Sequence, residues 1–286
     1  MKKTLLAVAV MLVLASCAFG AGHKVGVLEK LASSPEEFAK FAASKSEIFM
    51  SVSTQRPEFA FYKSLNEMIL ALNAGEIDEI LLPEETAEYV MALHPEYVIR
   101  CVIIFRQTKV LMSFGFKAGN EELRDSFSKA LAEMKKDGTL WTLEGKFMDN
   151  KNTALLEEKN ILASEMESAG LEASAPVIFR HFDGGRVIRA AVTGDIPPMD
   201  YIAPDGKPQG YNAAILAEIC GRLGLNAEIV NIDSGSRAAM LASGRADVVF
   251  WFEHYRGDDA NIDVPEGVIV SEPYYEMDTF FHLGKE

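Results

Sequence analysis

Positive charge is scarce in this chain. Its 286 residues include 28 lysines and arginines against 42 aspartates and glutamates, which gives a formal net charge of -14 at pH 7. A protein this acidic repels the phosphate backbones of DNA and RNA. We therefore do not expect it to bind nucleic acid.

The chain beyond its N-terminal segment has no long apolar run. No stretch there approaches the length of about 18 residues that a membrane-spanning helix needs. The chain also lacks a zinc-spaced His/Cys cluster, a nucleophile elbow and a phosphate-binding loop, and its five histidines are scattered. These absences predict a protein without a metal, without a cofactor and without catalytic residues.

Cysteine is rare, with three residues in the chain. Cys101 and Cys220 lie in apolar segments, so we expect both to be buried free thiols. A disulfide between them would require the two segments to be neighbours in the fold.

The third cysteine, Cys17, lies in a segment that is typical of a secretory signal, residues 1–22. Two lysines are followed by an apolar run from Leu5 to Ala15 and then by small residues. "LASC" matches a lipoprotein cleavage site and would place a lipid on Cys17, whereas Ala18-Phe19-Gly20 suits ordinary signal peptidase. Both readings predict a periplasmic or extracytoplasmic protein, and only the first gives it a membrane contact, through the lipid.

A short pattern occurs twice, as "LNAGEIDEI" at 72–80 and "LASGRADVV" at 241–249. In the first copy, Ser64 and Glu67 form a capping box ahead of a helix that Gly75 ends. An apolar run of strand length then follows the aspartate in each copy. The repeat predicts an α/β fold, and a chain of this length is expected to form two compact units.

Three further stretches make the chain resemble the bacterial extracellular solute-binding proteins of family 3, the receptors of polar amino-acid ABC importers. They are "VIRAAVTGDIPPMDYIAPDGKPQGYNAAILAEICGRLGLNAEIV" (187–230), "SEPYY" (271–275) and "FGFKAGNEELRDSFSKALAEMKKDGTLWTLEGKFM" (114–148), in which Leu123, Phe127, Ala130 and Met134 form a helical stripe. The resemblance implies a two-lobed periplasmic-binding-protein fold of type II, with a ligand cleft between the lobes.

The family's stretches stand in a different order in this chain. "KVGVLEKLASSPEEF" (24–38) resembles the start of the family's second lobe, yet it precedes the stretch that opens the family's first lobe. We interpret this as a circular permutation, with a swapped dimer or two fused half-proteins as alternatives. The expected parts are a signal peptide (1–22), the family's second lobe (24–115), the helices of its C-terminal signature packed on the other lobe (116–150), a connector (151–185) and its first lobe (186–286).

The resemblance also implies a ligand site. The family has an arginine that holds a ligand carboxylate after the strand that follows Asp247, and Arg256 is the candidate here. Trp251 and Phe252 occupy positions that line the ligand in the family and predict a flat ligand surface, with core packing as the alternative. Glu253 is a further candidate on the same strand.

Other candidates lie on both expected lobes. Asp195, Met199 and Tyr201 belong to the first ligand loop, where Asp195 would pair with a ligand cation. Ser33 and Ser34 match the helix start that binds a ligand carboxylate in the family, although plain helix capping explains them equally well.

Pro83 is the largest departure from the family. It occupies the position of an acid that binds the ligand's α-ammonium group. Either Glu84 substitutes for that acid, or the ligand has no α-ammonium group.

The predicted function is capture of a small polar or carboxylate-bearing solute, an amino acid or a related compound, for the permease of an ABC importer. One alternative is a periplasmic dehydratase-like enzyme on the same fold, for which Glu253 and His254 would be the acid–base pair. Another is a ligand-sensing partner of a membrane receptor.

Overall fold

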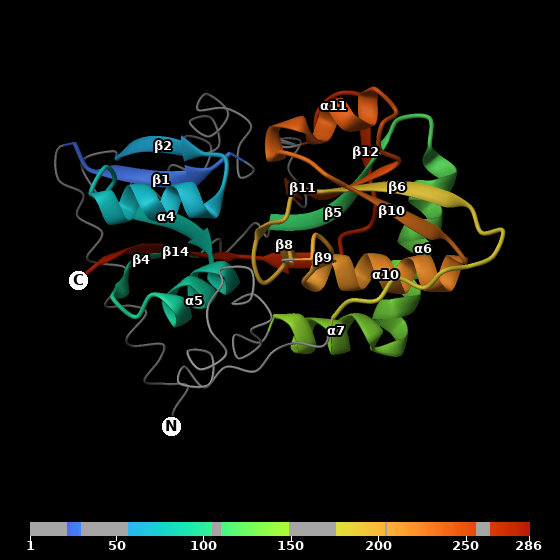
Figure 1. Ribbon diagram of the computed structural model, residues 1–286, viewed down its shortest axis with the longest axis horizontal. Helices are drawn as coiled ribbons and strands as arrows, with labels where there is room; N and C mark the ends of the chain where they lie inside the picture. The colour runs from blue at the N-terminus through green and yellow to red at the C-terminus, as the bar shows by residue number, and fades with distance from the viewer. Residues whose placement is uncertain (1–21, 30–56, 105–109, 149–175, 204, 256–263) are drawn as a thin grey trace. The chain divides into compact units, whose positions relative to one another are not determined.

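The structure is a computed structural model that describes residues 22–29, 57–104, 110–148, 176–203, 205–255 and 264–286. Its helices and strands form a mixed α/β fold, as the sequence predicted (Figure 1). The chain divides into two compact units. Unit 1 consists of Met1–Lys109 together with Met277–Glu286, and unit 2 of Val110–Glu276.

Unit 1 is built on one five-stranded sheet with the strand order β2-β1-β3-β14-β4. Helix α4 packs against β1, β2 and β3, and α5 packs against β3, β14 and β4. The elements are β1 (Lys24–Leu28), β2 (Glu58–Tyr62), α4 (Leu65–Ala74), β3 (Glu79–Pro83), α5 (Glu84–Leu93), β4 (Tyr97–Ile104) and β14 (Thr279–Lys285).

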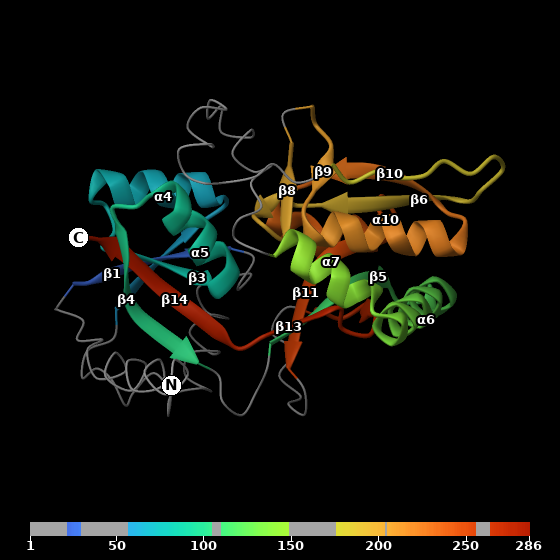
Figure 2. The ribbon, with the colours of Figure 1, turned by 90° about the horizontal axis from the view of Figure 1, so that it is seen from below.

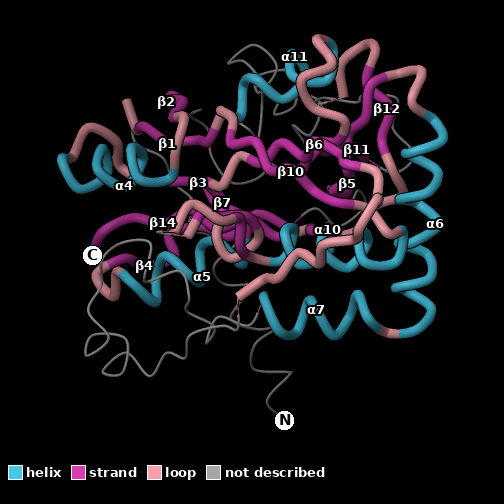
Figure 3. The backbone as a smooth tube through the Cα atoms, turned by 45° about the vertical axis from the view of Figure 1, so that its right-hand side comes forward, coloured by secondary structure: helices cyan, strands magenta, loops and turns pink. Residues whose placement is uncertain are grey.

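Unit 2 contains a sheet with the order β10-β6-β11-β5-β12, on which β13 also pairs with β5, and a small sheet β7-β8-β9. Helix α11 covers one face of the large sheet, α6 and α10 lie on the other, and α7 packs against α6 and α10 (Figure 3). The strands are β5 (Val110–Lys117), β6 (Val187–Val192), β7 (Asp195–Ile196), β8 (Asp200–Ile202), β9 (Pro208–Gln209), β10 (Asn226–Asn231), β11 (Val248–Tyr255), β12 (Val268–Val270) and β13 (Tyr275–Met277). The helices are α6 (Glu121–Asp137), α7 (Thr139–Phe147), α10 (Tyr211–Leu223), the 3-10 turn η1 (Ser234–Ser236) and α11 (Arg237–Ala242).

The two large sheets share one plan. In each, three parallel strands are followed by a fourth strand that runs antiparallel to them, and a fifth strand pairs with the fourth. The antiparallel strand is β14 in unit 1 and β5 in unit 2, and each comes from a part of the chain remote in sequence from its neighbours.

The boundaries of the two compact units differ from the expected lobe boundaries. We expected residues 24–115 in one lobe and 186–286 in the other, but β5 belongs to the sheet of unit 2 and β14 to the sheet of unit 1. The physical reason is that an interior strand needs hydrogen-bond partners on both sides, which β14 finds in β3 and β4. The expected signal (1–22) and connector (151–185) lie largely outside the described residues.

The aspartate of the repeated pattern joins two strands in each unit. The Asp78 backbone N–H donates to the Lys24 carbonyl oxygen at 2.9 Å, and the Asp78 carboxylate accepts from the Lys24 backbone N–H at 2.8 Å. In unit 2, Asp247 makes the same two bonds with the backbone of Arg189, both at 2.8 Å. The repeated aspartate therefore fixes the start of β3 beside β1, and of β11 beside β6.

The local signals around the pattern are also observed. Ser64 caps α4 by accepting from the Glu67 backbone N–H, although the Glu67 carboxylate accepts from Lys63 rather than from Ser64. Gly75 and Gly244 follow the two helices with φ of 74° and 69°, a left-handed conformation that side chains disfavour.

The predicted helical stripe on α6 is buried. Leu123, Phe127, Ala130 and Met134 are each at most 3% exposed, and α6 packs against β5 and α10. Cys220 is a buried free thiol on α10, and burial raises its pKa to about 12. Cys101 is also buried.

Asp247→Ala tests the role of the repeated aspartate. Loss of a carboxylate that accepts a backbone hydrogen bond should lower the free energy of unfolding by about 1.5–3 kcal/mol. Urea unfolding would measure this, with Asp183→Ala as the control because the Asp183 side chain is fully exposed. Equal stability of the two variants would contradict the role.

Candidate functional site

The carboxyl ends of the parallel strands β6, β10 and β11 meet at one edge of the large sheet of unit 2, which we call the carboxyl edge. The loop after β6 leads into the small sheet β7-β8-β9, which lies beside the start of α10 (Figure 2). The segment after β10 leads into α11. Strand ends of this kind are the usual place for ligand sites in α/β proteins.

Asp200 organises the loop that follows β6. The side chain of Asp200 is fully buried, and its Oδ2 accepts from the Thr193 backbone N–H, the Thr193 hydroxyl and the Gly194 backbone N–H at 3.3, 3.1 and 3.1 Å. Tyr274 lies nearby: complete burial, and then the negative charge of Asp200, hold the pKa of its hydroxyl well above the ordinary value. Tyr274 is therefore a neutral hydroxyl at this edge.

A buried guanidinium lies at the same edge. Arg237, the first residue of α11, is 4% exposed, and its Nη1 donates to the Trp251 carbonyl oxygen. The guanidinium carbon lies 5.1 Å from the centre of the Phe252 ring. Trp251 has a left-handed φ of 63°, and its indole N–H donates to the Glu253 carboxylate at 2.8 Å. Arg237 therefore holds the backbone of β11 where that strand is irregular.

Sequence reasoning missed Arg237, although a signal for it exists. Aligning the two copies of the pattern on Gly75 and Gly244 places Arg237 opposite Met68 of α4, which is fully buried. A charged residue at the position of a core methionine departs from the repeat, and such a departure marks a position that packing alone does not explain.

The aromatic candidates are buried. Trp251 is fully buried, and Phe252 is 1% exposed within a core cluster that includes Val249 and Leu241. The Phe252 ring fills the space above Gly115, where an added Cβ would lie 2.2 Å from it. The alternative of core packing therefore describes Phe252, and the structure presents neither ring as an exposed wall.

The loop candidates differ from one another in exposure. Met199 and Tyr201 are buried, whereas Asp195 is half-buried on β7, where it pairs in register with Tyr201. Of the three, Asp195 retains the partial exposure that a ligand contact requires.

Glu253 and His254 do not form an acid–base pair. Successive residues of a strand point to opposite faces, and here Glu253 accepts from Trp251, whereas His254 Nε2 lies 2.8 Å from the Ser113 hydroxyl oxygen. Burial lowers the pKa of His254. The arrangement required by the dehydratase-like alternative is not found at this pair.

Glu84 begins α5 in unit 1, directly after Pro83, and is half-buried. Burial raises the pKa of its carboxyl, and the neighbouring charges of Glu85 and Glu88 raise it further, against a hydrogen bond from Thr279. Glu84 is therefore an acid that is costly to ionise.

Several predicted residues lie outside the described ranges, namely Arg256, Ser33, Ser34 and Cys17. Among the residues that are described, no group of three or more His, Cys, Asp or Glu side chains is arranged to hold a metal ion. None of the helices in those ranges is both long enough and apolar enough to cross a bilayer.

Glu84→Gln tests the raised pKa. The Glu84 carboxyl holds its proton more tightly in the folded protein than in the unfolded one. The free energy of unfolding therefore falls as pH rises from the ordinary pKa of 4.5 through the raised value. Glutamine removes this cost, so the variant should melt at a higher temperature than the wild type at pH 7 and at the same temperature below pH 4.5. Calorimetry across pH would measure this, with exposed Glu58→Gln as the control; a constant difference would contradict it.

Arg237→Met tests the bond to Trp251. Methionine fills the equivalent position in unit 1, so the fold should persist while the Trp251 carbonyl loses its donor. In a Trp141→Phe background, which removes the exposed tryptophan, the emission of Trp251 should shift to the red and its quenching by acrylamide should increase. Exposed Arg245→Met is the control, and an unchanged spectrum in Arg237→Met would count against the role.

Comparison with known proteins gives a match over one segment. Residues 188–252 match the sequence profile of the bacterial extracellular solute-binding proteins, family 3. No curated protein matches the chain.

Solved structures give weaker likenesses. The ligand-binding component of an ABC-type import system from Staphylococcus aureus, solved with zinc bound, has a TM-score of 0.43 at 9% identity, over 92% of this chain and 65% of that one. The aliphatic sulphonate binding protein SsuA from Escherichia coli has a TM-score of 0.38 at 10% identity, over 92% and 65%. The substrate-binding domain of a putative molybdenum ABC transporter from Clostridium difficile has a TM-score of 0.40 at 12% identity, over 92% and 85%.

The chain thus spans about two thirds of the length of the first two structures, and likenesses with TM-scores below 0.5 carry no functional conclusion. The family match is limited to one segment, which is less than half of the chain. Over residues 188–252, from β6 to β11, the chain is similar to the bacterial extracellular solute-binding proteins of family 3, as its sequence predicted.

Proposed function

We propose that the protein is a non-catalytic, extracytoplasmic receptor that captures a small carboxylate-bearing solute for an ABC importer. The observation that carries the proposal is which segments of unit 2 the family match covers. Residues 188–252 include β6, the ligand loop, α10, β10, α11 and most of β11, so the match covers the segments that make up the carboxyl edge of unit 2.

The chemistry of this edge supports an anionic ligand. Arg237 places a buried positive charge at this edge, and Arg256 follows β11 directly in sequence. We propose Arg256 as the group that binds the ligand carboxylate through two parallel hydrogen bonds, with Arg237 holding the strand that leads to it.

The raised pKa of Glu84 bears on the other end of the ligand. A carboxyl that is costly to ionise gains from a nearby cation, because the cation offsets the cost of its negative charge. We propose that Glu84 substitutes for the acid that Pro83 displaces if the ligand carries an α-ammonium group. Ligand preference decides between this and a ligand without such a group.

We also propose that the chain order is a circular permutation of the family's order. In support, the two large sheets share one plan, and β14 would lead into β1 if the family's order were restored. The lipid on Cys17 and the choice between transport and sensing remain proposals of the same kind. Genes for a permease and an ATPase beside this gene would favour transport, and mass spectrometry of the mature N-terminus would detect the lipid.

A thermal-shift screen tests the proposed ligand class. Amino acids, their deaminated analogues and small aromatic acids would be compared, because a ligand that binds the folded state raises the melting temperature. At least one carboxylate should stabilise the protein. Preference for an amino acid would implicate Glu84, and preference for a deaminated acid would fit Pro83.

Arg256→Ala tests the carboxylate clamp. Removing one partner of a desolvated charge pair costs about 2–5 kcal/mol, so affinity for the best carboxylate should fall by roughly thirtyfold or more. Calorimetric titration would measure it, with Arg245→Ala as the control because Arg245 is exposed at the other edge of the sheet. Equal affinity of wild type and Arg256→Ala would remove the clamp assignment.

A further inference from the structure

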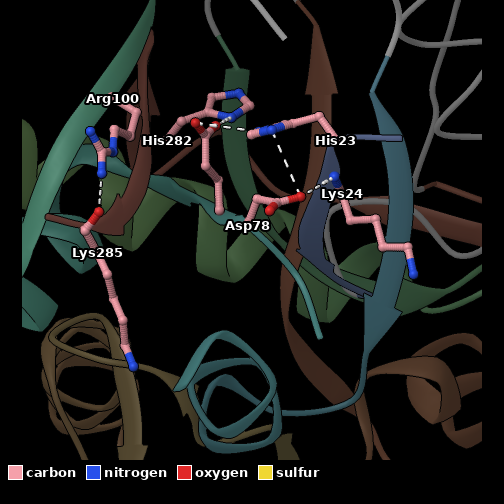
Figure 4. A network of polar contacts seen from close by, with 7 residues as sticks. His23, Lys24, Asp78, Arg100, His282 and Lys285 are labelled. Carbon is pink, nitrogen blue, oxygen red and sulfur yellow. Dashed lines mark hydrogen bonds and ion pairs between the residues drawn. The ribbon is translucent and has the colours of Figure 1, made fainter. Parts of the chain in front are cut away.

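Unit 1 contains a buried polar network that the proposed function does not use (Figure 4). The Glu79 carboxylate lies between two imidazoles: His282 Nδ1 is 2.9 Å from its Oε2, and His23 Nε2 is 3.3 Å from its Oε1. Glu79 is 7% exposed and His282 is 1% exposed. The three side chains, which we call the clasp, come from the residue before β1, from β3 and from β14.

The clasp has no counterpart in unit 2. The sheet registers pair Gly26 with Ile80 and Leu283 with Ile80, and the corresponding pairs in unit 2 are Ala191 with Val249 and Gly115 with Val249. Counting from these pairs, the positions of His23, Glu79 and His282 are occupied in unit 2 by Ile188, Val248 and Phe114.

All three of those unit 2 side chains are fully buried. The same scaffold therefore accepts an apolar trio at this place. A sheet with this strand order therefore does not need polar side chains at these three positions.

The clasp lies where the first described strand begins and the last strand ends. β14 runs antiparallel to β3, and β1 runs parallel to it, so the end of β14 and the start of β1 share one edge of the sheet. Both reach the residue that precedes β3: the Lys24 N–H donates to the Asp78 carboxylate at 2.8 Å, and a Cβ added at Gly284 would lie 3.2 Å from the Asp78 carbonyl oxygen. Because β3 lies between them, the end of β14 and the start of β1 are two strand spacings apart. This distance is about 10 Å, which three or four residues can span.

We propose that the clasp is an acid-sensitive closure, which ties β14 to the start of β1 across the place where the family's order would join them by a peptide connection. The comparison with a peptide connection in the family rests on the circular permutation that we propose above. The proposal does not depend on which ligand the protein binds. Its physical content is that unit 1 is held together at this edge by a titratable bridge instead of a covalent one.

The sign of the pH dependence follows from Glu79. Burial alone would raise the pKa of its carboxyl, but the hydrogen bonds and charges of His282 and His23 outweigh burial, and the pKa lies below its ordinary value of 4.5. A carboxyl with a lowered pKa contributes stability above its unfolded pKa of 4.5, and that contribution is lost as pH falls through the folded value. Below it, the carboxyl is neutral and the two imidazoles lose their anionic partner.

Other charged groups lie on the elements around the clasp. Asp78 is 3.7 Å from His23 Nδ1, and on β4 the Arg100 guanidinium donates to the Lys285 carbonyl oxygen (Figure 4). β1 carries Lys24, β14 carries Lys285, and Asp278 precedes β14. Helix α5 carries Glu84, Glu85 and Glu88. Because Glu84 also titrates in acid, the effect of the clasp must be measured as a difference between wild type and variant.

Hydrogen exchange of the full-length protein tests the proposal. Mass spectrometry would follow peptides of β1 and β14 between pH 7 and pH 3.5, corrected for intrinsic exchange, with peptides of α6 as the reference in unit 2. Two variants are compared with the wild type: Glu79→Gln, and the triple variant His23→Ile, Glu79→Val and His282→Phe, which installs the apolar trio of unit 2.

Glu79→Gln should lower protection of β1 and β14 by roughly tenfold to a hundredfold at pH 7, the range for hydrogen bonds to a charged group, and the difference should close as pH falls. The triple variant should stay protected and lose the acid-dependent part of the wild-type profile. If the ratio of wild type to Glu79→Gln is the same at every pH, the proposal is overturned. If the triple variant fails to fold, that ratio alone decides.

Discussion

In each large sheet, one interior strand pairs with strands that are remote from it in sequence, and the rest of the structure depends on this pairing. β14 has hydrogen-bond partners on both sides in unit 1, and β5 has them in unit 2. Neither sheet is complete without a segment that is remote in sequence, because an interior strand with unpaired backbone groups would be strongly unfavourable. The chain therefore passes between the units twice, from β4 to β5 and from β13 to β14. At the carboxyl edge of unit 2, β5 pairs with β11.

The two sheets follow one plan, so their differences locate the special positions of the molecule. Arg237 stands where unit 1 has the core residue Met68, and it brings a buried charge to the irregular part of β11. Glu79 stands where unit 2 has Val248, and it brings another to the start of β3. A buried charge is expensive unless partners compensate for it, so each of these two residues requires polar groups around it.

Two glutamates of unit 1 show how surroundings decide the pKa of one residue type. Burial raises the pKa of both Glu79 and Glu84. The histidines around Glu79 reverse the shift, whereas the acids Glu85 and Glu88 beside Glu84 add to it. One carboxyl is therefore held ionised and the other is costly to ionise, which suits a structural bridge in the first case and a cation partner in the second.

The sequence by itself determined the features that depend on residues close together in the chain. These include the α/β class, the helix ends at Gly75 and Gly244, the buried stripe of α6 and the similarity of residues 188–252 to a known family. Tertiary structure alone decided which remote strand completes each sheet, the burial of Trp251, the partner of Arg237 and the meeting of His23, Glu79 and His282. Caps and periodicity follow from contacts a few residues apart, whereas these features require contacts between distant segments, for which a single sequence carries no local signature.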